Sequence, residues 1–124
     1  ILTGWRVNYN TNRTFFAANK HDNEDKVFSE FYGNRVIKKT PGKNGSQELD
    51  ELLDMIFENQ ECALFVCRKL YRFFVHHDID ERTEEMVITP LAEIFRNNNY
   101  EILPVLQTLF SSQSASPHHR MWHR

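Results

Sequence analysis

The stretch from Ala17 to Lys26, AANKHDNEDK, places a histidine directly before an aspartate, and two more acids follow. Imidazole and carboxylate groups bind metal ions and move protons in hydrolytic enzymes, so His21 and Asp22 are the catalytic candidates and His21 is a metal candidate. Adjacent residues of an extended segment point to opposite faces, which prevents His21 and Asp22 from easily chelating one ion together. We therefore predict a strand-ending turn pinned by Asp22, with His21 facing a segment packed against it.

Two other histidine pairs give weaker indications of a metal site. His76 and His77 follow a predicted helix, and the next acids resemble the start of a calcium loop, but Arg82 stands where its fifth position needs a ligand. A helix end and loop is the better interpretation. His119 and His123 are spaced i, i+4 and are metal candidates if that segment is helical. Because neither pattern completes a ligand set, we expect no metal and no cofactor.

A basic stripe and two N-terminal apolar residues are the candidates for an interaction surface. Arg68, Lys69 and Arg72 either bind an anionic partner or pair with nearby acids such as Glu58 and Glu61. Leu2 and Trp5 are the N-terminal candidates. Cys62 and Cys67 lie about 140° apart on a helix, so they cannot form a disulfide within it.

The elements that position these residues change character near TPGKNGS, at residues 40–46, where turn formers cluster. We predict a β-hairpin segment over residues 1–45 that depends on the rest, a helical bundle over 46–112, and a loop or disordered tail over 113–124. The fold class is mostly α, a small N-terminal antiparallel hairpin or meander followed by four helices. The predicted strands lie around Arg13–Ala17, Lys26–Phe28 and Asn34–Lys38.

Apolar periodicity predicts the helices. Ser46 should cap the first, whose buried face is Leu49, Leu52, Leu53, Ile56 and Phe57, with Glu48, Asp50, Glu51 and Asp54 opposite. The second helix, residues 61–77, is apolar almost all the way round, so it should be the central helix of the domain. The third contains Pro90, which leaves two alternatives: one kinked helix, or a turn and then a helix that Thr89 caps. The last begins after Asn98 or Asn99, with buried positions Ile102, Leu103, Leu106, Leu109 and Phe110.

The net charge and the lengths of the apolar runs argue against some classes of function. The net charge is −2, which gives no electrostatic attraction to nucleic acid. No apolar run approaches the roughly 20 residues that span a bilayer. The chain opens within an element, on Ile1 to Trp5, as if at the exit of a helix, so we expect a fragment of a larger protein. Self-association is a further expectation, because Leu2 and Trp5 lack cover.

The order of several motifs resembles one protein family. LTGW at residues 2–5 precedes HD at 21–22 and Lys26, and the helices LDELLDMIFENQECALFVCRKLYRFFV, LAEIF and ILPVLQTLFSS follow. Together they resemble the C-terminal part of the bacterial family called domain of unknown function eighteen hundred. The resemblance implies a large, mostly helical protein, a bacterial envelope or secreted setting, and an upstream helical region as a partner. It also implies a co-encoded sulfatase-like protein as a partner, and it transfers no catalytic residue.

Two functions follow from these observations. The first is a non-catalytic packing or interaction module of a larger envelope or secreted protein. The alternative is part of a metal-assisted hydrolase, in which His21 and Asp22 supply part of a site that residues upstream of Ile1 complete. The environment of the His21 imidazole distinguishes the two.

Overall fold

The computed structural model describes residues 1–114, with side chains to Ser112, and shows two compact units, Ile1–Asn59 and the chain from Gln60 onward. The chain is mostly helical, with small antiparallel two-stranded sheets near the N-terminus, as the sequence predicts. No helix among the described residues is both long and apolar enough to cross a membrane. The predicted tail at 115–124, which includes His119 and His123, lies outside the described residues.

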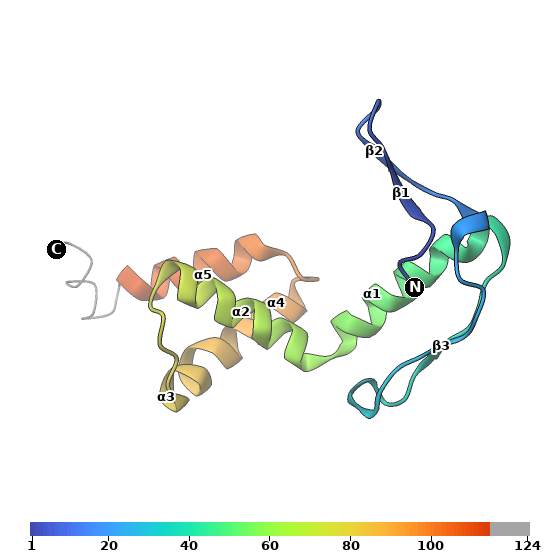
Figure 1. Cartoon of the computed structure of the whole chain (residues 1–124). Coiled ribbons are helices and arrows are strands. Elements are labelled where there is room, and N and C mark those ends of the chain that lie inside the picture. The colour runs from blue at the N-terminus through green and yellow to red at the C-terminus, as the bar shows by residue number, and fades with distance from the viewer. Residues whose placement is uncertain (115–124) are drawn as a thin grey trace. The chain divides into compact units, whose positions relative to one another are not determined.

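The first unit contains two separate β-hairpins (Figure 1). Strand β1 (Trp5–Asn8) pairs with β2 (Arg13–Phe16), and Trp5 lies opposite Phe16. Strand β3 (Lys26–Val27) pairs with β4 (Val36–Ile37). The three predicted strand positions are confirmed with shorter bounds. The prediction of a helix exit at Ile1–Trp5 is wrong, because these residues form a turn that leads into β1.

Three 3₁₀ turns connect these strands and precede the first helix. They are η1 (Ala18–Lys20), η2 (Glu30–Tyr32) and η3 (Gly42–Ser46), and α1 (Gln47–Glu58) follows η3 directly. The prediction that Ser46 caps α1 is wrong, since its hydroxyl donates to the Lys43 carbonyl at 3.2 Å. By its contacts α1 groups with the hairpins, whereas the sequence placed it with the helices that follow.

The buried face of α1 overlaps the predicted one in part, since Leu49, Leu52 and Ile56 are half-buried. Its two buried residues are Met55 and Glu48, and Glu48 was predicted to face solvent. Leu53 and Phe57, which were assigned to the buried face, are about 40% exposed. The segments that pack against the first turn of α1 present polar groups. The buried side chain at this position is therefore a carboxylate and not a leucine.

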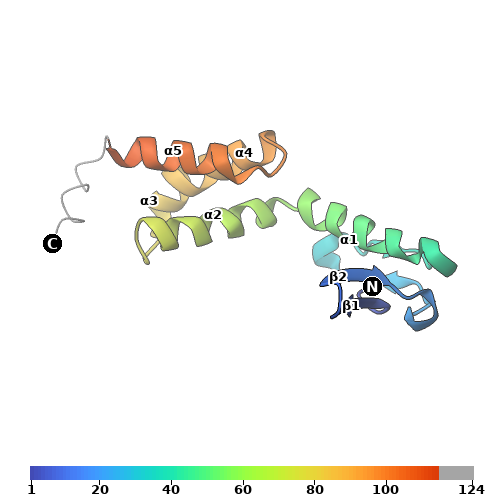
Figure 2. The ribbon, with the colours of Figure 1, turned by 90° about the horizontal axis from the view of Figure 1, so that it is seen from above.

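The second unit has a continuous apolar core between α2 (Gln60–Phe74), α4 (Thr89–Asn97) and α5 (Ile102–Ser114). Helix α4 contacts both α2 and α5 (Figure 2). The buried side chains of this core are Ala63, Cys67, Ile88, Leu91, Ala92, Phe95, Val105 and Leu109. Helix α2 is less enclosed than predicted, because Phe65 and Phe73 are exposed. Both cysteines are free, and burial raises the pKa of Cys67 to about 11.

Pro90 sits near the start of α4 without a break in the chain. A short helix α3 (Glu81–Thr83) runs into a π-helical turn, η4 (Glu84–Ile88), and then into α4. The Thr89 hydroxyl donates to the Glu84 carbonyl at 2.9 Å. A π turn accommodates an extra residue just before a proline, whose ring would clash with the carbonyl four residues earlier. Of the two alternatives the continuous one is correct, and Thr89 is itself helical instead of capping.

The turn into α5 uses two residues with positive φ, Asn99 (53°) and Tyr100 (60°). The predicted buried face of α5 is partly wrong. Ile102, Leu103 and Phe110 are exposed, while Val105 and Leu109 are buried. The helix also starts later than predicted and runs on to Ser114.

We expect Leu109→Ala to lower the free energy of unfolding by about 3 kcal/mol, because it leaves a cavity in the core of the second unit. Leu103→Ala, on the exposed side of the same helix, is the matched control and should change stability by less than about 0.5 kcal/mol. Urea unfolding followed by circular dichroism measures both. Equal losses would contradict the observed face of α5.

Candidate functional site

A polar cluster of the first unit surrounds the carboxylate of Glu48, which is fully buried in the first turn of α1. Lys26 Nζ lies 2.8 Å from Oε2, and His21 Nε2 lies 3.0 Å from the same oxygen. The backbone N–H of Thr40 donates to Oε1 at 2.8 Å. Groups that lie 8 to 27 residues from Glu48 in the sequence therefore converge on its carboxylate.

The imidazole of His21 is held on both sides. Nε2 faces the Glu48 carboxylate, and Nδ1 lies 2.8 Å from the Thr3 carbonyl oxygen. The Thr3 hydroxyl oxygen also lies 3.3 Å from Nδ1, so both ring nitrogens have protein partners. The His21 side chain is 1% exposed. In the observed arrangement, both ring nitrogens are engaged with protein groups and neither is open to a metal ion or a substrate.

Lys26 and Asp22 complete the cluster through backbone groups. Besides Glu48, Lys26 Nζ donates to the Asp22 carbonyl at 2.6 Å. The Asp22 carboxylate accepts the Glu24 N–H at 3.1 Å, which is the Asx-type turn predicted from the sequence. The Asp22 N–H donates to the Thr3 hydroxyl at 2.9 Å. His21 and Asp22 thus take separate roles, the first in the buried cluster and the second in the turn.

Two glycines allow the backbone to close around the His21 ring. A Cβ at Gly45 would lie 3.0 Å from His21 Cδ2 and from the Phe16 ring. A Cβ at Gly4 would lie 3.1 Å from His21 Cβ, and Gly4 has a φ of +87°, a conformation that glycine favours. The Phe16 ring meets the imidazole edge-on at 5.0 Å. The LTGW and KNGS motifs therefore enclose His21.

The pKa of Glu48 is set by two opposed effects. Burial raises it, because a desolvated carboxylate favours its neutral form, while hydrogen bonds from Lys26, from the Thr40 N–H and from His21 lower it. The net result is a pKa below the ordinary value of 4.5. Glu48 therefore remains ionised near neutral pH, and the cluster is a paired buried charge.

The N-terminal interaction candidates differ in exposure. Leu2 is 66% exposed. Trp5 is partly buried and packs against Phe16 with ring centroids 5.4 Å apart. Its indole Nε1 is buried and has no hydrogen-bond partner among the described residues.

The basic stripe on α2 is divided among different contacts. The Arg68 guanidinium donates to Glu84 and to Glu61, which raises its pKa. Lys69 lies over the Phe65 ring, 5.4 Å from its centroid, and Arg72 is exposed. Pairing with Glu61 was expected from the sequence. Glu58, the other expected partner, instead pairs with Arg35 at 2.9 Å.

Two cavities among the described residues lie away from His21. One of about 440 Å³ is lined by Ile79 and by acids of α3 and η4. The other, of about 190 Å³, lies in the first unit between η2 and α1, beside Phe31 and Met55. Neither adjoins the Glu48 cluster, which is packed with side chains.

Sequence reasoning missed the centre of the cluster. Glu48 was assigned to the solvent face of its helix, and Thr3, Lys26 and Thr40 were assigned no role. His21 faces Glu48 and Thr3, not an upstream segment. The available signal was a histidine between two glycine motifs, together with a glutamate in the first turn of a helix, but nothing local connects the two.

Comparison with known proteins identifies one family. A family model described as "Protein of unknown function (DUF1800)" matches residues 1–121. No curated protein and no solved structure matches the chain.

We expect Glu48→Gln to lower the free energy of unfolding by about 3 kcal/mol, because it leaves the largely buried Lys26 ammonium without its counter-charge. Glu51→Gln, at an exposed position of the same helix, is the matched control and should change stability by less than about 0.5 kcal/mol. Urea unfolding measures both. Similar small effects would show that the cluster contributes little.

The stabilisation by Glu48 should depend on pH in one direction. Because its pKa is lower in the folded chain, the stabilisation is complete above the ordinary value of 4.5 and is lost as the pH falls through the lowered folded pKa. The stability difference between wild type and Glu48→Gln should therefore shrink between pH 7 and pH 3. Asp25 and Asp80 also have lowered pKa values, but they are present in both proteins. A constant difference over this range would contradict the assignment.

Proposed function

The chain belongs to the DUF1800 family of proteins of unknown function, and on this premise we propose that it is a non-catalytic packing and interaction module of a larger bacterial envelope or secreted protein. The observation that carries the proposal is the β1–β2 hairpin. Beyond its first residue pair, Trp5 and Phe16, every residue of both strands is exposed. An isolated two-stranded hairpin is marginal in water, so this one requires support beyond its own two strands.

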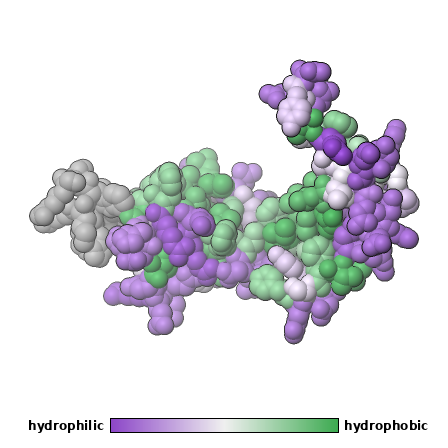
Figure 3. All heavy atoms as spheres, in the orientation of Figure 1, coloured by the Kyte–Doolittle hydropathy of each residue, from purple (hydrophilic) through white to green (hydrophobic). Residues whose placement is uncertain are grey.

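The exposed hairpin carries apolar side chains suited to a partner. Val7 and Phe15 are each about half exposed, and Tyr9 at the tip is 88% exposed. Figure 3 shows apolar and polar side chains together on this hairpin. Because the described sheet has only two strands, the outer edges of β1 and β2 also carry backbone groups that a further strand could pair. Side chains and backbone alike favour a protein partner.

The Glu48 cluster supports a structural role over a catalytic one. A general base or a metal ligand needs a lone pair that points at a reachable reactant. In the cluster, both nitrogens of His21 and both oxygens of Glu48 are engaged with protein groups, and both side chains are buried. The cluster therefore leaves His21 no open position for the metal-assisted hydrolase alternative.

The partner that we favour is the upstream part of the same protein. A co-encoded sulfatase-like protein is the second partner that the family resemblance suggests. Leu2 and the hairpin are near one another in the sequence and are both exposed, so one upstream segment could cover both.

In the intact protein that carries this chain, we expect Phe15→Ser to lower the free energy of unfolding by about 1 kcal/mol, since a partner segment would bury the remaining half of the ring. Thr14→Ser, at the neighbouring exposed position, is the control. Chemical denaturation gives the stabilities, and hydrogen exchange of the β1 and β2 amides gives an independent measure of cover. Fast exchange along both outer strand edges, with equal stability of the two variants, would contradict a docked hairpin.

A further inference from the structure

The loop between α2 and α3 presents two adjacent imidazoles and a carboxylate on a short, tied segment. At its start, the N–H groups of Val75 and His76 both donate to the Tyr71 carbonyl, at 2.8 and 3.2 Å. At its end, the Asp80 carboxylate accepts the Thr83 N–H at 2.7 Å and caps α3. Both ends of the loop are thus fixed by hydrogen bonds within the second unit.

His76, His77 and Asp78 lie close enough to share one ion. One potential ligand atom of each residue lies within 4.8 Å of those of the other two. Among the described residues, no other group of three or more His, Cys, Asp or Glu side chains lies this close together. The two rings are stacked, with centroids 4.5 Å apart and planes at 24°. His77 Nε2 lies 3.3 Å from Asp78 Oδ2. Ligands bonded at roughly 2 Å to one tetrahedral ion are about 3.4 Å apart, so small rotations of exposed side chains complete the geometry.

One hydrogen bond directs the ring of His76. The Asp78 N–H donates to His76 Nδ1 at 3.1 Å, so the lone pair on that nitrogen already points toward Asp78. A metal ion between the rings and the Asp78 carboxylate would replace this exposed bond. The exchange costs little, because all three residues are exposed and water can accept from the released Asp78 N–H.

The surroundings favour a cation. The loop follows the C-terminal end of α2, a 15-residue helix, where the partial charge is negative. Asp80, Glu81 and Glu85 follow in sequence and add negative charge, while Arg72 and Arg82 oppose it. Two imidazoles and one carboxylate suit zinc and similar divalent transition-metal ions, whereas calcium and magnesium prefer oxygen ligands alone.

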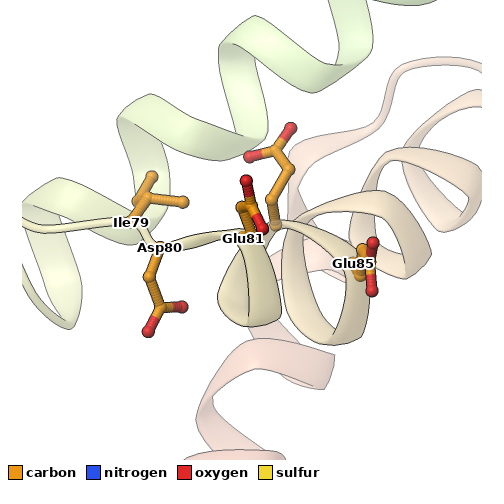
Figure 4. Close-up of a pocket in the computed structure, with 5 residues that line it drawn as sticks. Ile79, Asp80, Glu81 and Glu85 are labelled. Carbon is orange, nitrogen blue, oxygen red and sulfur yellow. The ribbon is translucent and has the colours of Figure 1, made fainter.

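The neighbouring acidic pocket is not an equivalent site. Figure 4 shows that the side chains of Asp80, Glu81 and Glu85 point in different directions instead of converging. Asp80 is engaged as the cap of α3, and Glu84, which also lines the pocket, holds Arg68.

We propose that His76, His77 and Asp78 bind one divalent transition-metal ion of the zinc class, with water in the remaining position. The ion would join the C-terminal end of α2 to the loop before α3. The site is separate from the Glu48 cluster and is independent of the proposed interaction role.

The test is titration of the 124-residue chain with zinc chloride at pH 7, followed by calorimetry and by NMR of the histidine ring nitrogens. Wild type should bind zinc at micromolar concentrations, with shifts at His76 and His77. Loss of a second-shell partner of a metal site costs roughly 10- to 100-fold in affinity, so His77→Ala should weaken this binding by at least about tenfold. A triple variant, His118, His119 and His123→Ala, is the matched control and should retain the site.

Circular dichroism should show the fold of His77→Ala unchanged, because this side chain is 80% exposed. Asp78→Asn provides a second variant that keeps the size of the side chain and should also weaken binding. Zinc binding that survives in both loop variants would overturn the proposal. So would binding that disappears only in the triple variant, or an absence of binding at 100 μM zinc, on the order of a hundred times the micromolar dissociation constant expected.

Discussion

The buried carboxylate of Glu48 is the constraint on which the first unit depends. A desolvated carboxylate costs several kcal/mol unless donors surround it, so the chain must bring those donors to it. Here they come from His21, Lys26 and the backbone of Thr40, and His21 is fixed in turn by Thr3. One charged group thereby fixes the positions of Thr3, His21, Lys26 and Thr40 relative to the first turn of α1.

The two units are stabilised in different ways. The buried hydrophobic residues described in the first unit are Ile37 and Met55, so the polar cluster carries much of what holds its strands and turns together. The second unit has a contiguous apolar core, and its principal ion pairs, from Arg68 to Glu61 and Glu84, lie at a partly exposed edge. Partly exposed pairs contribute little, whereas a buried pair is strongly destabilising when one partner is removed. Acid and single polar substitutions should therefore act mainly on the first unit.

Apolar periodicity predicted the positions of the helices in this chain better than it predicted which face of each helix is buried. The mostly helical class, the span of α1 and the turn at Asp22 follow from local patterns, and the structure has them. Glu48 could not be predicted, because a glutamate in a first helical turn suits solvent and the helix dipole equally well. Its partners lie 8 to 27 residues away, and no local pattern links them. The buried face of α5 includes Val105, which was not predicted. That face depends on the direction in which the chain leaves α4, and the turn there uses the two positive-φ residues Asn99 and Tyr100.

The Glu48 cluster has the features of a stabilising site and not those of a reactive one. A histidine beside an aspartate invites a catalytic interpretation, yet a reactive imidazole must keep one nitrogen available, and His21 has committed both. The exposed loop of His76, His77 and Asp78 has the opposite character: it contributes almost nothing to a core, and its ligand atoms remain accessible. In this chain the buried polar residues fix the fold, and the groups free to bind something lie on the exposed hairpin and on a loop between helices.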